Sequence, residues 1–315
     1  MKKVLTNITD FIGSTPMIEL RHVWNGKAKG RILAKMEFVQ PGGSIKDRAA
    51  LQIIKDAYKN GKLTNGQPVV EMTSGNMGAG LAVVCGAMGN PFIATMSEGN
   101  SPERRRIFNA LGAELVLVPQ VDGTPGKVTG NDIAGAVEKA KEIARERNAF
   151  YVDQFNNPSC VTAHYTSTGP EIWNTLEGKI DAFLASIGTG ATFIGTSRYL
   201  KEQNKNIYCA AVEPEKAAIL KKGYVENPKH IIQGTGYCLV PPLWDPKVAD
   251  EIITVTDEEV KQQTRLLAEK EGLYVGYSSG ANVCAAVKLI ESGVLKENPI
   301  VVTVLCDTAY KYSEL

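Results

Sequence analysis

A lysine lies at the junction between a strand-like and a helix-like segment near the start of the chain. Lys46 belongs to the run Pro-Gly-Gly-Ser-Ile-Lys-Asp-Arg at 41–48, which follows an apolar stretch at 31–38 and precedes a helical pattern at 49–59. Two glycines allow a tight turn there, and Ser44 can cap the helix that follows. The partial positive charge of a helix N-terminus disfavours an ammonium ion, so Lys46 is a better amine nucleophile than an ordinary lysine. Such an amine suits Schiff-base chemistry with an aldehyde cofactor, although this segment alone is also typical of a solvated lysine at a helix end.

A loop rich in glycine and threonine follows a predicted strand at 182–186. It comprises Gly188, Thr189, Gly190, Ala191 and Thr192, and a helical pattern begins directly after it. Closely spaced amides and two hydroxyls at a helix N-terminus form a natural cradle for phosphate. The loop lacks the Gly-Lys-Ser/Thr ending of a nucleoside-triphosphate loop and the G-x-G-x-x-G register of a dinucleotide fold, so a phosphate monoester fits it better. A glycine-rich turn without a ligand is the alternative interpretation.

A second polar loop, Thr73-Ser74-Gly75-Asn76, lies between a predicted strand at 68–72 and an apolar helix at 79–88. Two hydroxyls, an amide side chain and backbone N–H groups suit an α-carboxylate, and the alternative is a helix cap that uses Ser74. A third polar turn at 276–280 is weak evidence by itself. A reactive lysine, a phosphate cradle and a carboxylate cradle in one chain predict pyridoxal 5′-phosphate holding an amino acid.

The segments that position these loops alternate between strands and helices. Strands are predicted at 17–20, 31–38, 68–72, 92–96, 114–118, 150–153, 182–186, 207–212, 251–255 and 300–305, and helices at 49–59, 79–88, 102–111, 131–147, 161–176, 193–203, 258–270 and 281–292. This alternation predicts parallel sheets covered on both faces. The units exceed one sheet, so we expect two α/β domains with a cleft between them. In open α/β sheets ligands bind at the carboxyl ends of strands, where the polar loops lie.

Composition narrows the class of protein. The net charge of +1 predicts no recruitment of nucleic acid or of an acidic membrane surface. The six cysteines are scattered without a C-x-x-C pair, and the three histidines have no metal-ligand spacing, so we expect reduced thiols and no metal. The most apolar window, 77–96, is broken at Gly89-Asn90-Pro91, and no signal peptide is visible. These features predict a soluble cytoplasmic protein.

Over nearly its whole length the chain resembles the cysteine synthase and cystathionine β-synthase family, pyridoxal-phosphate enzymes of fold type II. The resemblance runs from Ile12-Gly13-Ser14-Thr15-Pro16 to Asp307-Thr308, and it includes the lysine segment, the two loops and Gln233-Gly234-Thr235-Gly236. It implies two three-layer α/β domains with mainly parallel sheets, similar to the tryptophan synthase β subunit, with the cofactor in the cleft between them. It also implies a smaller mobile domain at 42–152 for the substrate carboxylate and a larger domain at 1–41 and 153–315 for the cofactor phosphate.

The resemblance assigns roles to individual residues. Lys46 matches the Schiff-base lysine, and its freed amine would remove the α-proton. Asn76 should bond the 3′-oxygen of the cofactor, and Gln154 should help to hold the substrate carboxylate. The expected cofactor-binding residues are Lys46, Asn76, Gly188, Thr189, Gly190, Ala191 (where a glycine is usual), Thr192 and Thr308. The expected substrate-binding residues are Thr73, Ser74, Asn76, Met77, Gln154, Gly234 and Tyr237. Thr308 falls against the pyridine nitrogen, where a neutral hydroxyl favours loss of a β-substituent.

The reaction that the resemblance implies is β-replacement. O-Acetylserine, serine or cysteine would lose its β-substituent to give an α-aminoacrylate, and a sulfur nucleophile would then add to the β-carbon. Sulfide, homocysteine or a second cysteine would give cysteine, cystathionine or lanthionine, with hydrogen sulfide made or consumed. A homodimer and small-molecule partners are also implied.

Two positions depart from the cysteine synthase pattern. Met77 stands where a threonine is general, and Tyr237-Cys238 stands where small residues are usual. A tyrosine at 237 is the cystathionine β-synthase pattern, and its phenol could protonate a poor leaving group such as hydroxide or hydrosulfide. We therefore expect serine or cysteine, as well as an O-acyl serine, to be activated, with Tyr237 as a catalytic residue. The alternative is that Tyr237 only fills space.

Other functions stay open at this point. A β-eliminating serine or threonine dehydratase, or a cysteine desulfhydrase, shares the fold, although the Thr-Ser-Gly-Asn loop favours replacement. Outside enzymes, the chain could be an amino-acid sensor or a protein that binds a partner's C-terminal tail, such as that of serine acetyltransferase. Retention of Lys46 argues against a silent sensor.

Overall fold

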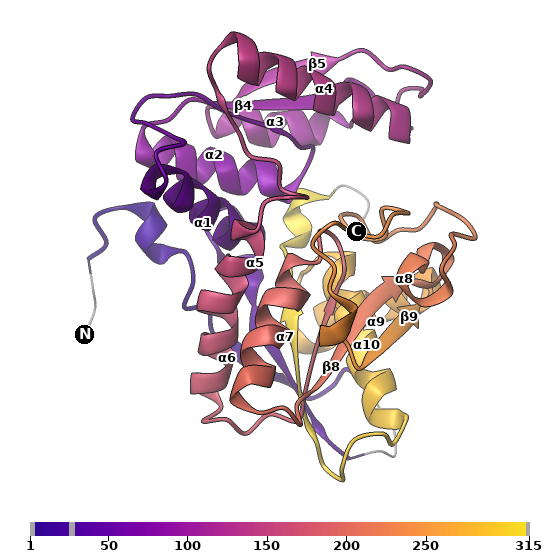
Figure 1. Cartoon of the computed structure of the whole chain (residues 1–315). Helices are drawn as coiled ribbons and strands as arrows, with labels where there is room; N and C mark the ends of the chain where they lie inside the picture. The colour runs from indigo at the N-terminus through magenta and orange to yellow at the C-terminus, as the bar shows by residue number, and fades with distance from the viewer. Residues whose placement is uncertain (1–3, 25–28, 313–315) are drawn as a thin grey trace. The chain divides into compact units, whose positions relative to one another are not determined.

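The computed structural model describes residues 4–24 and 29–312. The chain divides into two compact units, whose elements are labelled in Figure 1. The smaller unit comprises 4–13, Gln40–Cys160 and 311–312, and the larger comprises 14–24, 29–39 and Val161–Tyr310. This division places 4–13, 40–41, 153–160 and 311–312 in the smaller unit, whereas the resemblance implied that they belong to the larger domain.

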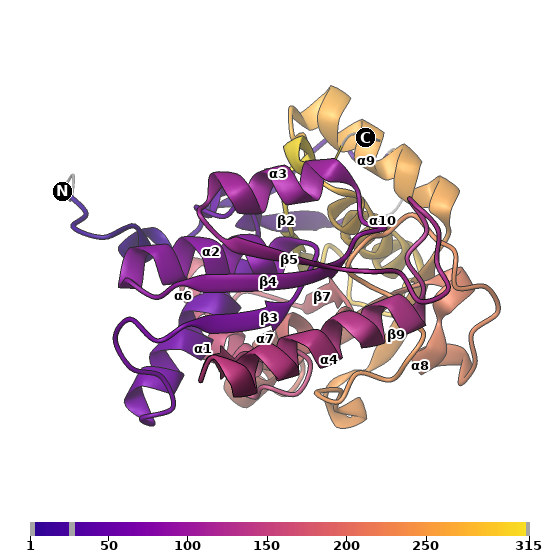
Figure 2. The same cartoon turned by 90° about the horizontal axis from the view of Figure 1, so that it is seen from above.

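A parallel sheet forms the centre of the smaller unit. In its described part the strand order is β5-β4-β3-β6, and Figure 2 shows β5, β4 and β3 side by side in this order. The strands are β3 (Val69–Met72), β4 (Phe92–Ser97), β5 (Glu114–Val118) and β6 (Phe150–Tyr151). The helical elements are η1 (Ile8–Phe11), α1 (Lys46–Lys59), α2 (Asn76–Met88), α3 (Pro102–Ala110) and α4 (Gly130–Glu146). Val70 and Ile93 pack against α4, and their strand neighbours Val69 and Phe92 are also buried, so both faces of the sheet are covered.

A larger sheet forms the centre of the other unit. In its described part the order is β1-β2-β10-β7-β8-β9, in which β1 and β2 are antiparallel and the other neighbours are parallel. The strands are β1 (Met17–Leu20), β2 (Arg31–Met36), β7 (Ala182–Ser186), β8 (Tyr208–Pro214), β9 (Glu251–Val255) and β10 (Ile300–Leu305). The helical elements are η2 (Glu37–Val39), η3 (His164–Thr168), α6 (Gly169–Thr175), α7 (Ala191–Gln203), η4 (Glu215–Ala217), α8 (Ile219–Lys222), η5 (Pro246–Val248), α9 (Asp257–Glu271), α10 (Tyr277–Glu291) and η6 (Ala309–Lys311). The short helix α5 (Ser159–Ala163) crosses the division between the units.

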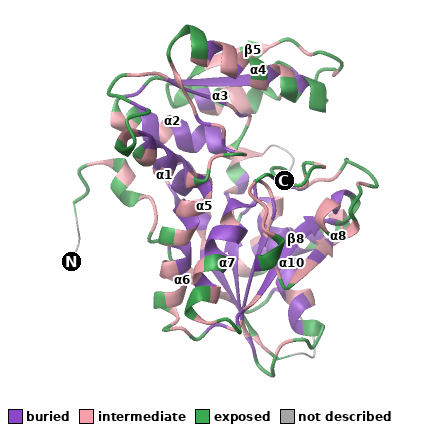
Figure 3. Ribbon diagram, viewed as in Figure 1, coloured by how far each residue is buried: buried purple, intermediate pink, exposed green. Residues whose placement is uncertain are grey.

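The central strands of the larger sheet are buried along their length, as Figure 3 shows by colour. Residues 182–185 of β7 and 301–305 of β10 have almost no exposed surface, and α9 and α10 contribute to the apolar cluster on this sheet. Continuous burial is the pattern of a parallel sheet with helices on both faces. Together with the strand orders of the two sheets, this confirms the predicted α/β fold with mainly parallel sheets.

One predicted helix differs in its middle turn. The segment predicted at 161–176 is helical, but residues 164–168 form the π-helical turn η3 between α5 and α6. Within it the Ser167 hydroxyl donates to the Ala163 carbonyl at 2.5 Å, and the Thr166 hydroxyl donates to the Thr162 carbonyl at 2.8 Å. Hydroxyls that bond the carbonyl one turn earlier compete with the helical ladder, which favours a local change of pitch.

None of the helices of the described residues is long and apolar enough to cross a membrane.

Candidate functional site

Lys46 is the first residue of α1, as its sequence context predicts. Its backbone N–H donates to the Ser44 hydroxyl at 3.2 Å, while Ile45 occupies the N-cap position. The neighbouring Asp47 is buried and accepts a hydrogen bond from the N–H of Gly42. A Cβ at Gly42 would lie 2.4 Å from the Asp47 carboxylate, so glycine is required for this contact. The turn therefore fixes Lys46 at a helix N-terminus through its buried neighbours.

The predicted carboxylate loop lies in the same unit and leads into α2. Gly75 is the N-cap of α2 and offers no side chain to this helix, whose third amide, that of Gly78, is bonded by Thr73. The buried Thr73 hydroxyl accepts hydrogen bonds from the N–H groups of Gly75 at 3.4 Å and Gly78 at 3.1 Å, which orders the loop from within. Met77 is only 3% exposed, so its side chain belongs to the packed interior of the smaller unit.

Two cations hold the ends of this loop. The Arg104 Nη1 donates to the Ser74 hydroxyl at 2.8 Å and to its carbonyl at 3.1 Å. Lys311 Nζ donates to the Asn76 side-chain oxygen at 2.7 Å. Because Arg104 occupies a lone pair of Ser74, the Ser74 hydroxyl proton is directed to another acceptor. The loop thus presents a hydroxyl donor and the positive end of a helix, which together suit a carboxylate.

Gln154 is oriented by a buried glutamate that the sequence analysis missed. Gln154 Nε2 donates to Glu71 Oε1 at 3.1 Å, and the N–H of Asp153 donates to Glu71 Oε2 at 2.9 Å. Burial raises the pKa of Glu71 to about 8, although both donated hydrogen bonds favour its charged form. Glu71 could have been found from the sequence, because it is a charged residue within the otherwise apolar strand β3. Glu71 accepts one hydrogen bond from the amide of Gln154, and that amide has a second N–H that can donate.

In the larger unit, the predicted phosphate loop ends at the N-terminus of α7. Gly190 is the N-cap with φ 86°, and Ala191 is the first helical residue. The Thr192 hydroxyl lies 3.2 Å from His164 Nε2, and His164 Nδ1 lies 2.9 Å from the Thr168 hydroxyl. The N–H of Ala191 donates to the Thr189 hydroxyl at 3.5 Å, and the glycine cap places no side chain on the amides that follow in this 13-residue helix, where an anion can bind. The loop therefore fits the phosphate of pyridoxal 5′-phosphate.

The loop that carries Tyr237 packs directly on the phosphate loop. A Cβ at Gly188 would lie 2.4 Å from the Gly234 carbonyl oxygen and 3.9 Å from the Tyr237 ring. The N–H of Gly236 also donates to the Ile187 carbonyl at 3.3 Å. Tyr237 is 42% exposed. Gly234 and Tyr237 thus lie beside the predicted phosphate-binding residues.

Thr308 is positioned by the third polar turn. Thr308 forms an isolated bridge with Val275, and the N–H of Gly276 donates to the Asp307 carbonyl at 3.1 Å. The Cys306 N–H donates to the Ser279 hydroxyl at 2.9 Å. The turn at 276–280 therefore holds the segment 306–308 at the carboxyl end of β10.

The predicted residues are divided between the two units. The smaller unit holds Lys46, Thr73, Ser74, Asn76, Met77 and Gln154, and the larger unit holds Gly188, Thr189, Gly190, Ala191, Thr192, Gly234, Tyr237 and Thr308. Three residues that were not predicted from the sequence form hydrogen bonds with predicted ones: Glu71, Arg104 and Lys311.

Comparison with known proteins gives consistent matches. The family model described as "Pyridoxal-phosphate dependent enzyme" matches residues 8–307. A cysteine synthase of Staphylococcus aureus (strain N315) is 41% identical over 312 residues, which are 99% of this chain and 96% of that protein. A hydrogen sulfide-producing enzyme from Fusobacterium nucleatum superposes with a TM-score of 0.90 at 32% identity, covering 99% of each chain. An O-acetylserine-dependent cystathionine β-synthase from Helicobacter pylori has a TM-score of 0.89 at 36% identity, covering 100% of this chain and 99% of that one.

Proposed function

This chain belongs to the family of pyridoxal-phosphate-dependent enzymes, and we propose that it catalyses β-replacement on a serine-type amino acid with a sulfur nucleophile. The observation that carries the proposal is the presence of two predicted anion loops at glycine-capped helices, α2 and α7, together with Lys46 at a third helix N-terminus. An amino acid on a phosphorylated aldehyde cofactor needs these three features.

The cofactor, when bound, supplies an electrophilic carbon and an electron sink for the α-carbon of the substrate. Gly188, Thr189, Gly190, Ala191 and Thr192 would hold its phosphate, Asn76 its 3′-oxygen and Thr308 its pyridine nitrogen. Lys46 Nζ provides the amine for attachment and then takes the α-proton of the substrate.

The remaining residues orient the substrate. The Ser74 hydroxyl, the first amides of α2 and the Gln154 amide would bind the α-carboxylate, with Thr73 and Met77 shaping the loop. Gly234 and Tyr237 would face the β-carbon. The exposed phenol of Tyr237 would donate a proton to a departing hydroxide or hydrosulfide, which extends the donors from O-acetylserine to serine and cysteine. The products are cysteine, cystathionine or lanthionine, depending on the nucleophile.

The assembly and location follow as further parts of this proposal. Residues 42–152 would act as a mobile substrate-carboxylate domain, and 1–41 with 153–315 as the cofactor-phosphate domain. All six cysteines lie in the part of the chain that the structure describes and are free thiols, which supports a reducing, cytoplasmic location. We also propose a homodimer, and sedimentation equilibrium would measure this oligomeric state.

Rapid mixing of the purified holoenzyme with O-acetylserine, serine and cysteine in turn tests the proposal. We expect a change in the visible absorbance of the cofactor with at least one donor, followed by recovery when sulfide or homocysteine is added. Lys46→Ala should abolish turnover, whereas Lys55→Ala, at an exposed position of the same helix, should not. A holoenzyme that turns over none of the three donors would contradict the proposal.

A further inference from the structure

The residues 232–237, here called the tyrosine loop, run from the buried Ile232 to the exposed Tyr237. Ile232 and Thr235 are buried, and the Thr235 hydroxyl donates to the Ile232 carbonyl at 3.0 Å. Gln233, Gly234 and Tyr237 are exposed. Gly234 and Gly236 have φ of 81° and 57°, so the backbone turns sharply twice. Contacts from residues outside such a loop help to keep it in one conformation.

His230 makes such a connection between the two ends of the tyrosine loop. Its Nδ1 lies 3.2 Å from the N–H of Ile232, and its Nε2 lies 3.3 Å from the carbonyl oxygen of Gly236. A backbone N–H can only donate and a carbonyl can only accept, so Nδ1 carries a lone pair and Nε2 carries the proton. The contacts are therefore specific to one neutral tautomer. Protonation of Nδ1 would place two donors face to face and break the bond to Ile232.

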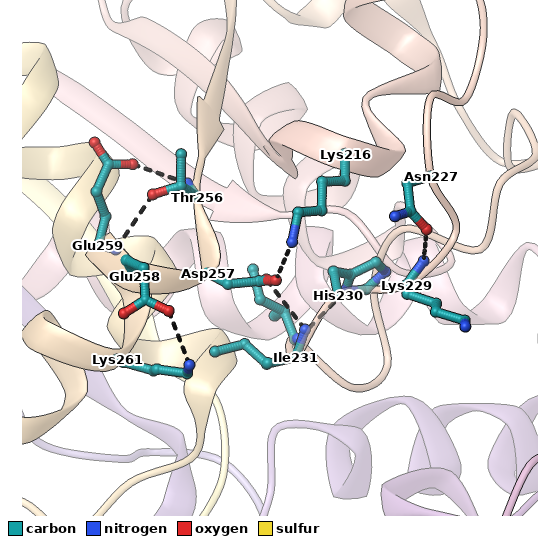
Figure 4. A network of polar contacts seen from close by, with 11 residues as sticks. Lys216, Asn227, Lys229, His230, Ile231, Thr256, Asp257, Glu258, Glu259 and Lys261 are labelled. Atoms are coloured by element: carbon teal, nitrogen blue, oxygen red, sulfur yellow. Dashed lines mark hydrogen bonds and ion pairs between the residues drawn. The ribbon is translucent and has the colours of Figure 1, made fainter.

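A charged network holds the segment that leads into the tyrosine loop (Figure 4). Asp257, the first residue of α9, accepts hydrogen bonds from Lys216 Nζ at 2.8 Å and from the N–H of Ile231 at 3.2 Å. A capping box between Thr256 and Glu259 fixes the start of this helix. Asp257 is thus a rigid attachment point for the residue that follows His230.

The surroundings of His230 favour its neutral form. Burial lowers the pKa of His230, against the Gly236 carbonyl and the Asp257 carboxylate, which raise it, while the Lys216 ammonium lowers it further. The two charged side chains that act on the imidazole are Asp257, on α9, and Lys216, on η4.

We propose that neutral His230 is a positioning residue that holds the tyrosine loop on the phosphate loop, so that Tyr237 and Gly234 keep their places beside Gly188. The proposal rests on the proposed function for the role of Tyr237, but the state of the imidazole does not depend on it. Activity should therefore fall at acidic pH as His230 gains a proton and the tyrosine loop is released.

Nuclear magnetic resonance of the imidazole nitrogens tests the tautomer directly. The chain has three histidines, so 15N-histidine labelling with the variants His22→Gln and His164→Gln assigns every signal. We expect His230 to show a protonated Nε2 and a bare Nδ1, and to stay neutral at a pH where free histidine is half protonated. A proton on Nδ1, or titration of His230 at the pH at which free histidine titrates, would overturn the proposal even if the enzyme is active.

Substitutions test the consequence for catalysis. His230→Ala loses both contacts, and we expect kcat/KM to fall about 10- to 100-fold, because a displaced catalytic group is costly. His230→Asn keeps an acceptor near the position of Nδ1 for the Ile232 N–H, so its kcat/KM should be several-fold higher than that of His230→Ala. Because asparagine does not titrate, the fall of activity at acidic pH that His230 causes should also disappear. His22→Gln, on an exposed side chain, should match wild type.

Cofactor absorbance and thermal unfolding of the same variants separate positioning from general stability. Reduced kcat/KM with retained cofactor and a similar unfolding midpoint in the Ala and Asn variants supports the proposal. Equal activity of His230→Ala and wild type, or activity losses in Ala and Asn that only follow lowered unfolding midpoints, would overturn it. If wild type has no β-replacement activity, the proposed function fails, while the resonance result still decides the state of His230.

Discussion

The side-chain amide of Gln154 donates to the buried carboxyl group of Glu71 at 3.1 Å. The pKa of Glu71 is raised by burial to about 8, above its unfolded value of 4.5. Between these two values the folded state holds one more proton than the unfolded state, so stability must fall as the pH rises through this window.

The first prediction follows from this proton. Glu71→Gln replaces the carboxyl by a neutral amide, so the difference in unfolding free energy between wild type and variant should decline by up to about 1.4 kcal/mol per pH unit from pH 5 to 8 and then level off. Urea unfolding of both proteins at several pH values measures it. A difference that does not change with pH would mean that Glu71 ionises alike in both states.

The second prediction concerns the cation behind Ser74. Arg104→Gln removes the charged donor that directs the Ser74 hydroxyl proton outward, and we expect a KM for the amino acid about 5- to 30-fold higher with kcat little changed, from the loss of about 1–2 kcal/mol of binding. Arg106→Gln, at an exposed position of the same helix, is the matched control. Equal KM values for the two variants would exclude Arg104 from substrate binding.

The third prediction concerns the contact between the phosphate loop and the tyrosine loop. Gly188→Ala would place a Cβ 2.4 Å from the Gly234 carbonyl, and both loops must move because the clash is with backbone. We expect weaker binding of pyridoxal phosphate and a loss of about 1–3 kcal/mol of stability. Gly86→Ala, where the new Cβ has no neighbour within 4 Å in an exposed helix position, should instead stabilise by about 0.4–1 kcal/mol. Fluorescence titration with the cofactor and thermal unfolding compare the two, and equal behaviour would refute the close packing.

The fourth prediction concerns Tyr237. Tyr237→Phe removes the phenolic proton and keeps the ring, so turnover of serine or cysteine should fall by about 100-fold or more relative to O-acetylserine, whose leaving group needs less protonation. Initial rates with the three donors measure this ratio. Unchanged relative rates would leave Tyr237 with a space-filling role only.

Much of the fold was predictable because its signals are local. Apolar strands such as 301–305 and the helices between them follow from hydropathy and turn residues alone, and the position of Lys46 at a helix N-terminus followed from its glycines and Ser44. The π-helical turn at His164–Thr168 was not predictable, because it depends on hydroxyls that bond carbonyls within an otherwise helical pattern.

The residues that bond to the predicted loops could not be predicted from the sequence, for a different reason. Arg104 and Lys311 reach Ser74 and Asn76 from 30 and 235 positions away in the chain, so spacing carries no sign of the contact. The polar loops themselves were identifiable because their backbone amides and hydroxyls are consecutive in sequence.

The pairing of β2 with β10 has a consequence for synthesis on the ribosome. Arg31 of β2 is in register with Ile300 of β10, about 270 residues later. At translation rates of about 5–20 residues per second, β2 therefore waits roughly 15–50 seconds with one edge and its apolar Ile32 and Ala34 unpaired. Residues 40–160 can meanwhile complete the parallel sheet of the smaller unit. The nascent chain therefore carries an exposed edge of β2 until β10 emerges, and an exposed strand edge favours aggregation. A chaperone would have the greatest effect during this interval.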